Sequence, residues 1–305
     1  HDERIKLIDL GGNHNPLEMV YTISHRLKGI VPLKCLALAG TGYSTLSPPR
    51  AEYNNLDSLI SAAGGIGALG HELKKLQWDQ FSLSDISHDF GCMDDIHQLA
   101  RANNWHLCVE KTELAYSVSS TCIDSYMASL GSNTRSVYFN RRHRLAKMGE
   151  IELINFGYEK AYDFFAILNQ FHIPRWGRPC YSTDSIKFMC GLVERVYFGG
   201  GIPILQLMRV EGEVVSVIYD IEWDGVRYNL QSGYKEGRFP KIALGSIHFG
   251  YAIEEAIRKG CIYDFMAGMG KNNNYKKNIA NCEMSLSSFT LNKGLIKCLY
   301  QIYGK

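Results

Sequence analysis

The segment PILQLMRVEGEVVSVIYDIEWDGVRYNLQSGYK, residues 203–235, constrains the fold more than any other part of the chain. It contains three runs of apolar, β-branched and aromatic residues, separated by Glu211-Gly212-Glu213 and Trp223-Asp224-Gly225. Both separators suit the tight turn of an antiparallel hairpin. The segment therefore predicts three consecutive antiparallel strands.

A basic turn that contains glycine follows these strands and leads into a helix. The helix is predicted from Phe239 to Lys259, with Gly260 at its C-terminal cap, and CIYDFMAG predicts a further strand. A helix N-terminus presents backbone N–H groups and a partial positive charge, so this turn can hold a pyrophosphate. An ordinary capped helix packed on a sheet is the alternative. The residues predicted to contact the phosphates are Arg238, Lys241, Leu244, Gly245 and Ser246.

The glycine of this turn gives a direct test of the predicted phosphate site. Gly245 would let a phosphate approach the backbone closely, because glycine has no side chain. Gly245→Trp is therefore expected to abolish activity without unfolding the protein.

The whole chain has the mixed strand and helix pattern of an α/β protein with a mixed sheet. Its 305 residues fit two domains. We expect an N-terminal half over residues 1–124, with a hairpin around Leu27-Lys28-Gly29, and a C-terminal domain over residues 125–305. A basic helix over 125–148 connects them, and a later helix is predicted to end before Pro174.

Composition excludes several classes of function. The net charge is +2, so no global attraction to nucleic acid is encoded. No run approaches the roughly 18–20 apolar residues of a membrane span. The nine cysteines occur singly, without a CxxC pair, so neither a metal site nor a disulfide framework is predicted. Reduced thiols favour a cytoplasmic location.

The ordered motifs of the chain resemble those of the CelD/BioF2-like acetyltransferase family. The resemblance is strongest for GEVVSVIYDIEWDGVRYNLQSGY, ALGSIHFGYAIEEAIRKGC and YDFMAGMGKNNNYKK, and upstream FNRRHRLAKMG, RLKGIVPLKCLAL and WDQFSLSDIS also fit. Two features depart from the pattern: Phe239-Pro240-Lys241 replaces the more usual Ser-Pro-Gly turn, and Asn272–Asn274 alters the loop before Tyr275.

The resemblance implies two GNAT-like (acyl-CoA N-acyltransferase) halves in tandem, as in FemAB-type transferases, with the active site in the second half. Two parallel strands would splay apart there, namely Arg227–Gly233 and Ile262–Ala267, and the acyl-pantetheine arm of acyl-CoA would lie between them. Pantetheine amides would pair with the exposed strand edge. The backbone N–H groups of Leu230, Gln231 and Ser232 would contact the acyl carbonyl.

Transfer to an amine requires removal of a proton, stabilisation of the carbonyl oxygen and reprotonation of the leaving thiolate. Asp264 is the candidate base, with Glu222 as its substitute, and Tyr275 is the candidate acid. Each has a plainer alternative: Asp264 would bond backbone at a strand end, and Tyr275 would belong to a solvated helix face with Lys276 and Lys277.

Three cations are candidate substrate-binding residues: Arg141, Arg142 and Lys276. Arginine suits bidentate recognition of an anionic substrate group or of the phosphates of coenzyme A. The alternative for the arginines is a solvated helix face. His248 has apolar neighbours along the chain, which favours a buried, hydrogen-bonded histidine over a base.

The leading hypothesis is an N-acyltransferase that uses acetyl- or longer acyl-CoA and a small amine acceptor, such as an amino sugar or an amino acid. An acyl carrier protein could present the same pantetheine arm. A FemAB-type transferase with aminoacyl-tRNA as donor is the second hypothesis, against which the near-neutral charge counts. A non-catalytic GNAT-like module in a polysaccharide or natural-product pathway is the third.

Overall fold

The computed structural model describes residues 6–9, 19–27, 31–38, 52–54, 56–88, 92–268, 275–294 and 296–298. They form two compact units. The first unit takes the described residues up to Leu114 and those from Met284 onward, and the second runs from Ala115 to Glu283. The division proposed at residue 124 lies inside the second unit. Strands β5 and β11 contribute residues to both units.

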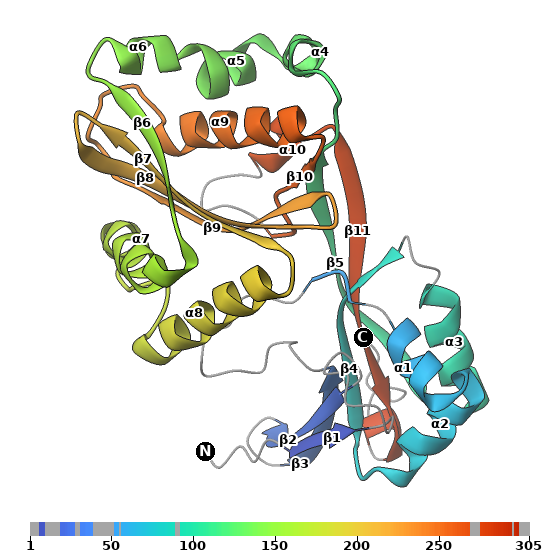
Figure 1. The fold of residues 1–305 in the computed structure, drawn as a ribbon. Helices are drawn as coiled ribbons and strands as arrows, with labels where there is room; N and C mark the ends of the chain where they lie inside the picture. The colour runs from blue at the N-terminus through green and yellow to red at the C-terminus, as the bar shows by residue number, and fades with distance from the viewer. Residues whose placement is uncertain are drawn as a thin grey trace. The chain divides into compact units, whose positions relative to one another are not determined.

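The first unit is a mixed sheet flanked by the helices α1, α2 and α3 (Figure 1). Its sheet order is β1-β2-β3-β4-β11, and β2 pairs antiparallel with β3, which confirms the predicted hairpin. Its turn at Lys28-Gly29 and the segment Asn272–Asn274 lie outside the described residues. The bounds are β1 Lys6–Asp9, β2 Met19–Leu27, β3 Val31–Leu38, α1 Asp57–Ala63, α2 Ile66–Lys75, β4 Gln80–Ser87, α3 Cys92–Ala102 and β11 Cys282–Asn292.

The second unit is built on a sheet with the order β5-β10-β9-β8-β7-β6. Its strands are β5 His106–Val118, β6 Ile151–Phe156, β7 Ile202–Val210, β8 Glu213–Trp223, β9 Val226–Tyr234 and β10 Ile262–Asp264. Its helices are α4 Ile123–Ser129, α5 Ser132–Arg135, η3 Ser136–Asn140, α6 Arg142–Ala146, η4 Tyr158–Lys160, α7 Ala161–Trp176, α8 Thr183–Phe198, α9 Leu244–Lys259 and α10 Lys276–Ile279.

The three predicted antiparallel strands are β7, β8 and β9. Both connecting turns place two residues at positive φ: 51° and 76° at Glu211 and Gly212, and 49° and 75° at Asp224 and Gly225. These angles are those of a type I′ turn, whose twist matches that of the flanking strands. Local turn chemistry therefore determines this part of the sheet.

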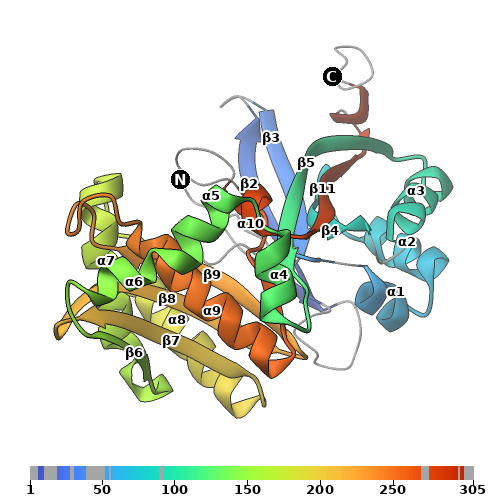
Figure 2. The ribbon, with the colours of Figure 1, turned by 90° about the horizontal axis from the view of Figure 1, so that it is seen from above.

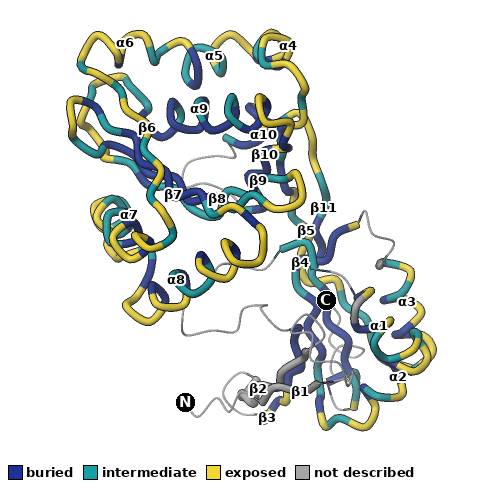
Figure 3. The backbone as a smooth tube through the Cα atoms, in the orientation of Figure 1, coloured by how far each residue is buried: buried dark blue, intermediate teal, exposed yellow. Residues whose placement is uncertain are grey.

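The two faces of this sheet are covered by different helices, as Figures 1 and 2 show. Successive side chains of a strand point to opposite faces. Val217 and Tyr219 of β8 accordingly lie in the core formed with α7 and α8, whereas Ile218 lies in the core formed with α9. Figure 3 shows buried residues along the strands and along α9. The predicted α/β class with a mixed sheet is confirmed.

The basic connector predicted over 125–148 is not one helix. It consists of α4, α5, the π-helical turn η3 and α6. Leu130 leaves α4 with extended backbone angles, and Gly131 starts the next piece, so the chain bends there.

The prediction that a helix ends before Pro174 is also wrong. Helix α7 continues through Pro174 and ends at Gly177, where φ is 71°. Proline removes one intrahelical hydrogen bond, and in the last turn of a helix few residues remain to be disturbed. Gly177 ends the helix because glycine adopts the left-handed conformation without strain.

Helix α9 approaches the backbone of η3 closely at Gly250. A Cβ atom at this position would overlap the Tyr138 backbone oxygen, whereas a Cβ at Gly191 of α8 would meet nothing within 4 Å. We expect Gly250→Ala to lower the free energy of unfolding by about 1–3 kcal/mol through overpacking. Gly191→Ala is expected to raise it by up to about 1 kcal/mol, since alanine favours helix. Urea denaturation of both variants measures this, and a stabilising Gly250→Ala would contradict it.

Candidate functional site

Strands β9 and β10 run parallel but pair only where they begin. Val226, Arg227 and Tyr228 pair with Ile262, Tyr263 and Asp264. Strand β9 then continues to Tyr234, and over this stretch its pairing within the described part of the chain is with β8. The predicted parallel pair is confirmed, although β10 ends at Asp264 instead of Ala267. We call the open side of β9 beyond Tyr228 the β9 edge.

The backbone of β9 directs particular N–H groups toward this edge. Lys235 N–H donates to the Val215 carbonyl of β8 at 2.9 Å. Because hydrogen-bonding directions alternate along an antiparallel strand, the N–H groups of Ser232 and Tyr234 point away from β8. The register also shifts between Tyr219 and Asp220, which makes Leu230 the inserted residue of a bulge. Of the predicted carbonyl-binding groups, the Ser232 N–H therefore lies at the β9 edge, whereas the prediction for the Gln231 N–H is wrong because the same alternation turns it toward Tyr219 of β8.

The entry to α9 brings basic residues together. The helix starts at Leu244, five residues later than predicted at Phe239, because residues 239–243 form a turn. Arg141 Nη1 donates to the Lys241 backbone oxygen at 3.4 Å, which places both cations at this entry. Arg238 is held by Glu213 at 2.7 Å and is exposed to solvent. No described side chain caps the first turn of α9.

Gly245 has a packing role that the sequence did not reveal. Leu244 and Gly245 are buried, and a Cβ at Gly245 would lie 2.7 Å from the ring of Tyr234. The expectation that Gly245→Trp spares the fold is therefore wrong, because the indole would displace Tyr234. The Ser246 hydroxyl forms a hydrogen bond with Tyr138, which ties η3 to the start of α9.

Asp264 is the last residue of β10 and is buried. Its Oδ1 accepts the Met266 N–H at 2.5 Å, and Met266 has a φ of 58°. The carboxylate therefore stabilises the bend after β10, as the plainer alternative proposed. It also acts on Tyr228 of β9, whose pKa is raised by burial and then by Asp264. Its role as a base stays a prediction.

Tyr275 lies in an aromatic cluster, so the alternative of a solvated helix face is wrong for this residue. Its ring centroid is 6.0 Å from Phe249 and 6.3 Å from Phe265. Burial raises the pKa of its phenol well above 10. The group therefore keeps its proton at physiological pH, as a proton donor requires.

Lys276 is buried, whereas a cation that binds the substrate would lie on an open surface. Its Nζ donates to the backbone oxygens of Met266 and Ala267 at 3.0 and 2.8 Å. Together with Asp264 it fixes the backbone that leaves β10. We expect it to position this segment.

Glu222 and Arg142 have partners away from the β9 edge. Glu222 pairs across the sheet with Arg227, where β9 and β10 are joined, and its carboxylate lies 3.6 Å from Lys259. Arg142 holds the carboxylate of Glu254 with both Nη atoms and stacks over Tyr251 at 4.7 Å. The structure thus gives each a structural partner, and their functional roles stay predictions.

Four residues near the β9 edge were missed by sequence reasoning: Tyr138, His172, Arg175 and Tyr234. Tyr138, Arg175 and Tyr234 all act electrostatically on Tyr275. Arg175 lies 4.9 Å from the centroid of the Tyr234 ring. Because these groups come from η3, α7 and β9, no spacing in the sequence indicates that they meet.

A buried charged network holds the joined end of β9 and β10. Asp220 and Arg227 are both fully buried, and Asp220 Oδ2 accepts from Arg227 Nε at 2.6 Å. Asp220 Oδ1 accepts from Asn229 at 2.7 Å and from the Tyr263 hydroxyl at 3.4 Å, and Arg227 also binds Glu255 at 3.0 Å. The network links β8, β9, β10 and α9 next to the bulge.

His248 is a buried, hydrogen-bonded histidine, as the sequence favoured. Its ring nitrogens lie 3.0 Å from Ser216 Oγ and 3.1 Å from Gln206 Oε1. Burial, and then the charge of Arg227, lowers its pKa from 6.5 to about 3. The imidazole is therefore neutral at pH 7.

This lowered pKa makes stability depend on pH. Between about pH 6.5 and pH 3 the unfolded chain binds a proton at residue 248 that the folded chain does not bind, so stability falls as the pH falls. We expect the free energy of unfolding of the wild type to decrease in this window by up to about 1.4 kcal/mol per pH unit more than that of His248→Gln. Urea denaturation at a series of pH values measures the difference, and equal slopes would contradict the prediction.

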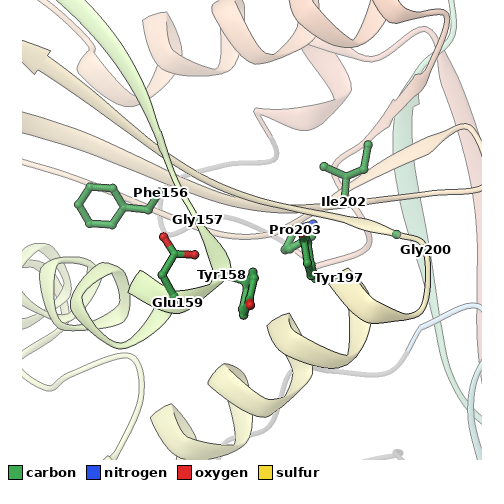
Figure 4. Close-up of a pocket in the computed structure, with 9 residues that line it drawn as sticks. Phe156, Gly157, Tyr158, Glu159, Tyr197, Gly200, Ile202 and Pro203 are labelled. Carbon is green, nitrogen blue, oxygen red and sulfur yellow. The ribbon is translucent and has the colours of Figure 1, made fainter.

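A pocket of about 380 Å³ lies where β7 begins (Figure 4). Ile202 pairs with Glu222, which places the pocket toward the joined end of β9 and β10. The Tyr158 and Tyr197 rings stack in its wall at 4.4 Å, and the Glu159 carboxylate turns back over Gly157. The pocket is therefore separate from the β9 edge.

Two searches of the described residues were negative. None of their helices has the length and apolar character needed to cross a membrane. Nor do they contain a group of three or more His, Cys, Asp or Glu side chains that could hold a metal ion.

Comparison with known proteins finds a family model that matches part of the chain. The model of the acetyltransferase (GNAT) domain matches residues 132–277, whereas no curated protein matches the chain significantly. The crystal structure of FemX is similar with a TM-score of 0.58 and 13% identity, over 99% of this chain and 91% of that chain.

Two further solved structures are similar at comparable levels. The C-terminal domain of a putative lysylphosphatidylglycerol synthetase from Agrobacterium fabrum has a TM-score of 0.55 and 6% identity, over 98% of this chain and 86% of that chain. A conserved protein of unknown function from Bacteroides thetaiotaomicron VPI-5482 has a TM-score of 0.54 and 9% identity, over 95% and 86%. At these identities the likeness concerns the fold alone. The domain match and the splayed β9–β10 pair together show that the second unit has the fold of a GNAT-family acyltransferase.

Proposed function

We propose that the protein is an N-acyltransferase that moves an acyl group, acetyl or longer, from acyl-CoA to the amine of a small metabolite such as an amino sugar or an amino acid. Within the GNAT fold, the ordered motifs favour the CelD/BioF2-like group. The observation that carries the proposal is the β9 edge: three paired residues join β9 to β10, and β9 then runs free of β10 to Tyr234.

The residues around this edge fit the chemistry of an acyl-CoA. Backbone groups of β9 that point away from β8 can pair with the amides of a pantetheine arm, as in strand addition. The start of α9, with Lys241 and Arg141 beside it, suits the phosphates because helix N-terminal N–H groups and nearby cations favour anions. Acyl-CoA supplies the acyl thioester.

The groups at the β9 edge would then carry out the remaining steps of the acyl transfer. The Ser232 N–H, which points away from β8, would donate a hydrogen bond to the acyl carbonyl oxygen, in which negative charge develops during the transfer. Asp264 would orient the amine or accept its proton, and Tyr275 would return a proton to the departing thiolate. Lys276 would keep the backbone between these two groups in place.

The alternative donors are an acyl carrier protein, which carries the same pantetheine arm, and an aminoacyl-tRNA, as in FemAB-type transferases. The net charge of +2 supports a small-molecule donor over a nucleic acid. The described cysteines form no disulfide bonds with one another, which fits a reducing, cytoplasmic setting. A non-catalytic role is the remaining alternative.

Calorimetric titration with acetyl-CoA and decanoyl-CoA tests the donor directly. Binding of at least one of them, with release of coenzyme A when an amine library is added, is the expected result. Binding without thiol release would favour a non-catalytic module. No binding of either compound, together with transfer from charged tRNA, would favour the FemAB-type reaction and overturn the proposal.

A further inference from the structure

The side chain of Gln231 folds back onto its own backbone at the β9 edge. Its Oε1 accepts the Ser232 N–H at 3.0 Å, and its Nε2 donates to Cys180 Sγ at 3.2 Å. His172 of α7 interacts with the Gln231 side chain and with the Ser232 backbone. The Gln231 amide is therefore held between the bulge and the α7–α8 connection.

The connection that anchors Gln231 is itself fixed. Asn169 of α7 binds Tyr181 twice, since its Nδ2 donates to the Tyr181 oxygen at 2.8 Å and its Oδ1 accepts the Tyr181 N–H at 2.9 Å. Cys180, the preceding residue, is thus presented at a defined position. Gln231 has a stable partner for its amide nitrogen while its oxygen faces Ser232.

The hydrogen bond to Ser232 engages the group that was assigned to the acyl carbonyl. The alternation set by Lys235 directs Ser232 N–H away from β8. The atom that accepts it is an sp² carbonyl oxygen, the same kind of acceptor as the oxygen of a thioester. An acyl carbonyl and the Gln231 oxygen therefore compete for one donor.

We propose that Gln231 is a built-in competitor of the acyl donor, which occupies the Ser232 N–H with its own amide oxygen until the acyl carbonyl displaces it. This inference rests on the proposed acyl transfer at the β9 edge. The sequence prediction for Gln231 concerned its backbone N–H, whereas this inference concerns its side chain. The apparent affinity for the donor is the intrinsic affinity multiplied by the fraction of molecules whose donor site is competent. Removal of the competitor raises this fraction and therefore raises the apparent affinity.

The expected size follows from the strength of one neutral hydrogen bond. Gln231→Met keeps the length of the side chain but removes its oxygen, and we expect it to bind acetyl-CoA about two- to tenfold more tightly than the wild type. Gln231→Glu offers Ser232 a charged acceptor, which forms a stronger hydrogen bond. This variant is expected to bind acetyl-CoA more weakly.

Calorimetry on the full chain compares the dissociation constants for acetyl-CoA. Gln98→Met and Gln98→Glu, at an exposed position of α3 in the first unit, make the same chemical changes outside the second unit and serve as matched controls. Hydrogen exchange of the Ser232 amide gives a second measurement that needs no ligand, and it should be faster in Gln231→Met than in the wild type.

The outcomes separate this inference from the proposed function. Tighter binding in Gln231→Met, with faster Ser232 exchange and unchanged Gln98 controls, supports it. Equal or weaker binding in Gln231→Met, while the wild type binds, overturns the competitor role and leaves the acyltransferase proposal standing. If the wild type and all variants bind no acyl-CoA, both the proposed function and this inference fail.

Discussion

Asp220→Leu is expected to lower the free energy of unfolding by about 3–5 kcal/mol, because it leaves a buried cation without its main partner. Arg227 is fully buried, and its shortest ion pair is the 2.6 Å contact with Asp220. Glu255 is the other carboxylate in contact, at 3.0 Å, and it is partly exposed. Urea denaturation measures the loss.

The double variant Asp220→Leu/Arg227→Met is the decisive comparison. Replacing both charges with apolar groups removes the unpaired cation, so we expect it to be more stable than the single variant by at least about 2 kcal/mol. A double variant that is no more stable than Asp220→Leu would show that the cost arises from packing and not from charge. The affinity of the double variant for acetyl-CoA is informative too, because Asn229, next to the bulge, donates a hydrogen bond to Asp220.

Much of the second unit's sheet was predictable because its signals are local. Glu211-Gly212 and Asp224-Gly225 specify type I′ turns within two residues, and the strands between them then pair by necessity. The parallel partner at Ile262–Asp264 was found from the order of elements and from the family resemblance. Features that depend on residues close together in the chain could therefore be predicted from the sequence.

The parts that failed depend on contacts between distant residues. The expectation that Gly245→Trp spares the fold failed, because the Tyr234 ring leaves no room for a side chain at this position. The alternative of a solvated helix face for Tyr275 failed, because Phe249 and Phe265 pack around its ring. In both cases the deciding neighbour lies on another element.

The candidate site shows the same division. The segment predicted to contact the acyl carbonyl lies on β9 beyond its pairing with β10, and Arg141 and Lys241 meet at the entry to α9. The residues that surround Tyr275 from η3 and α7 had no signal, since a lone tyrosine or arginine on a helix has no characteristic spacing. Glu222 was proposed as a base in place of Asp264, and the register pairs it with Arg227 at the joined end of β9 and β10.

Tyr275→Phe is expected to lower kcat about 100-fold, a typical loss when a positioned proton donor is removed. The ring keeps its contacts with Phe249 and Phe265, so the free energy of unfolding and the dissociation constant for acetyl-CoA should not change. Burial raises the pKa of the wild-type phenol above 10, so its proton is retained and this group should cause no loss of activity as the pH rises from about 6 to 9. Coenzyme A release under single-turnover conditions measures the chemical step.

The choice of leaving group tests the assigned role itself. If Tyr275 gives its proton to the departing thiolate, an acyl thioester of a more acidic thiol needs that proton less, and the variant should recover part of its rate with such a donor. Tyr126→Phe is the matched control: its hydroxyl is also buried and donates to the Ile279 oxygen at 2.6 Å, so its loss should reduce stability but not kcat. A kcat in Tyr275→Phe within twofold of the wild type, or a loss independent of the leaving group, would exclude Tyr275 as the acid and direct attention to the other phenols near it, Tyr138 and Tyr234.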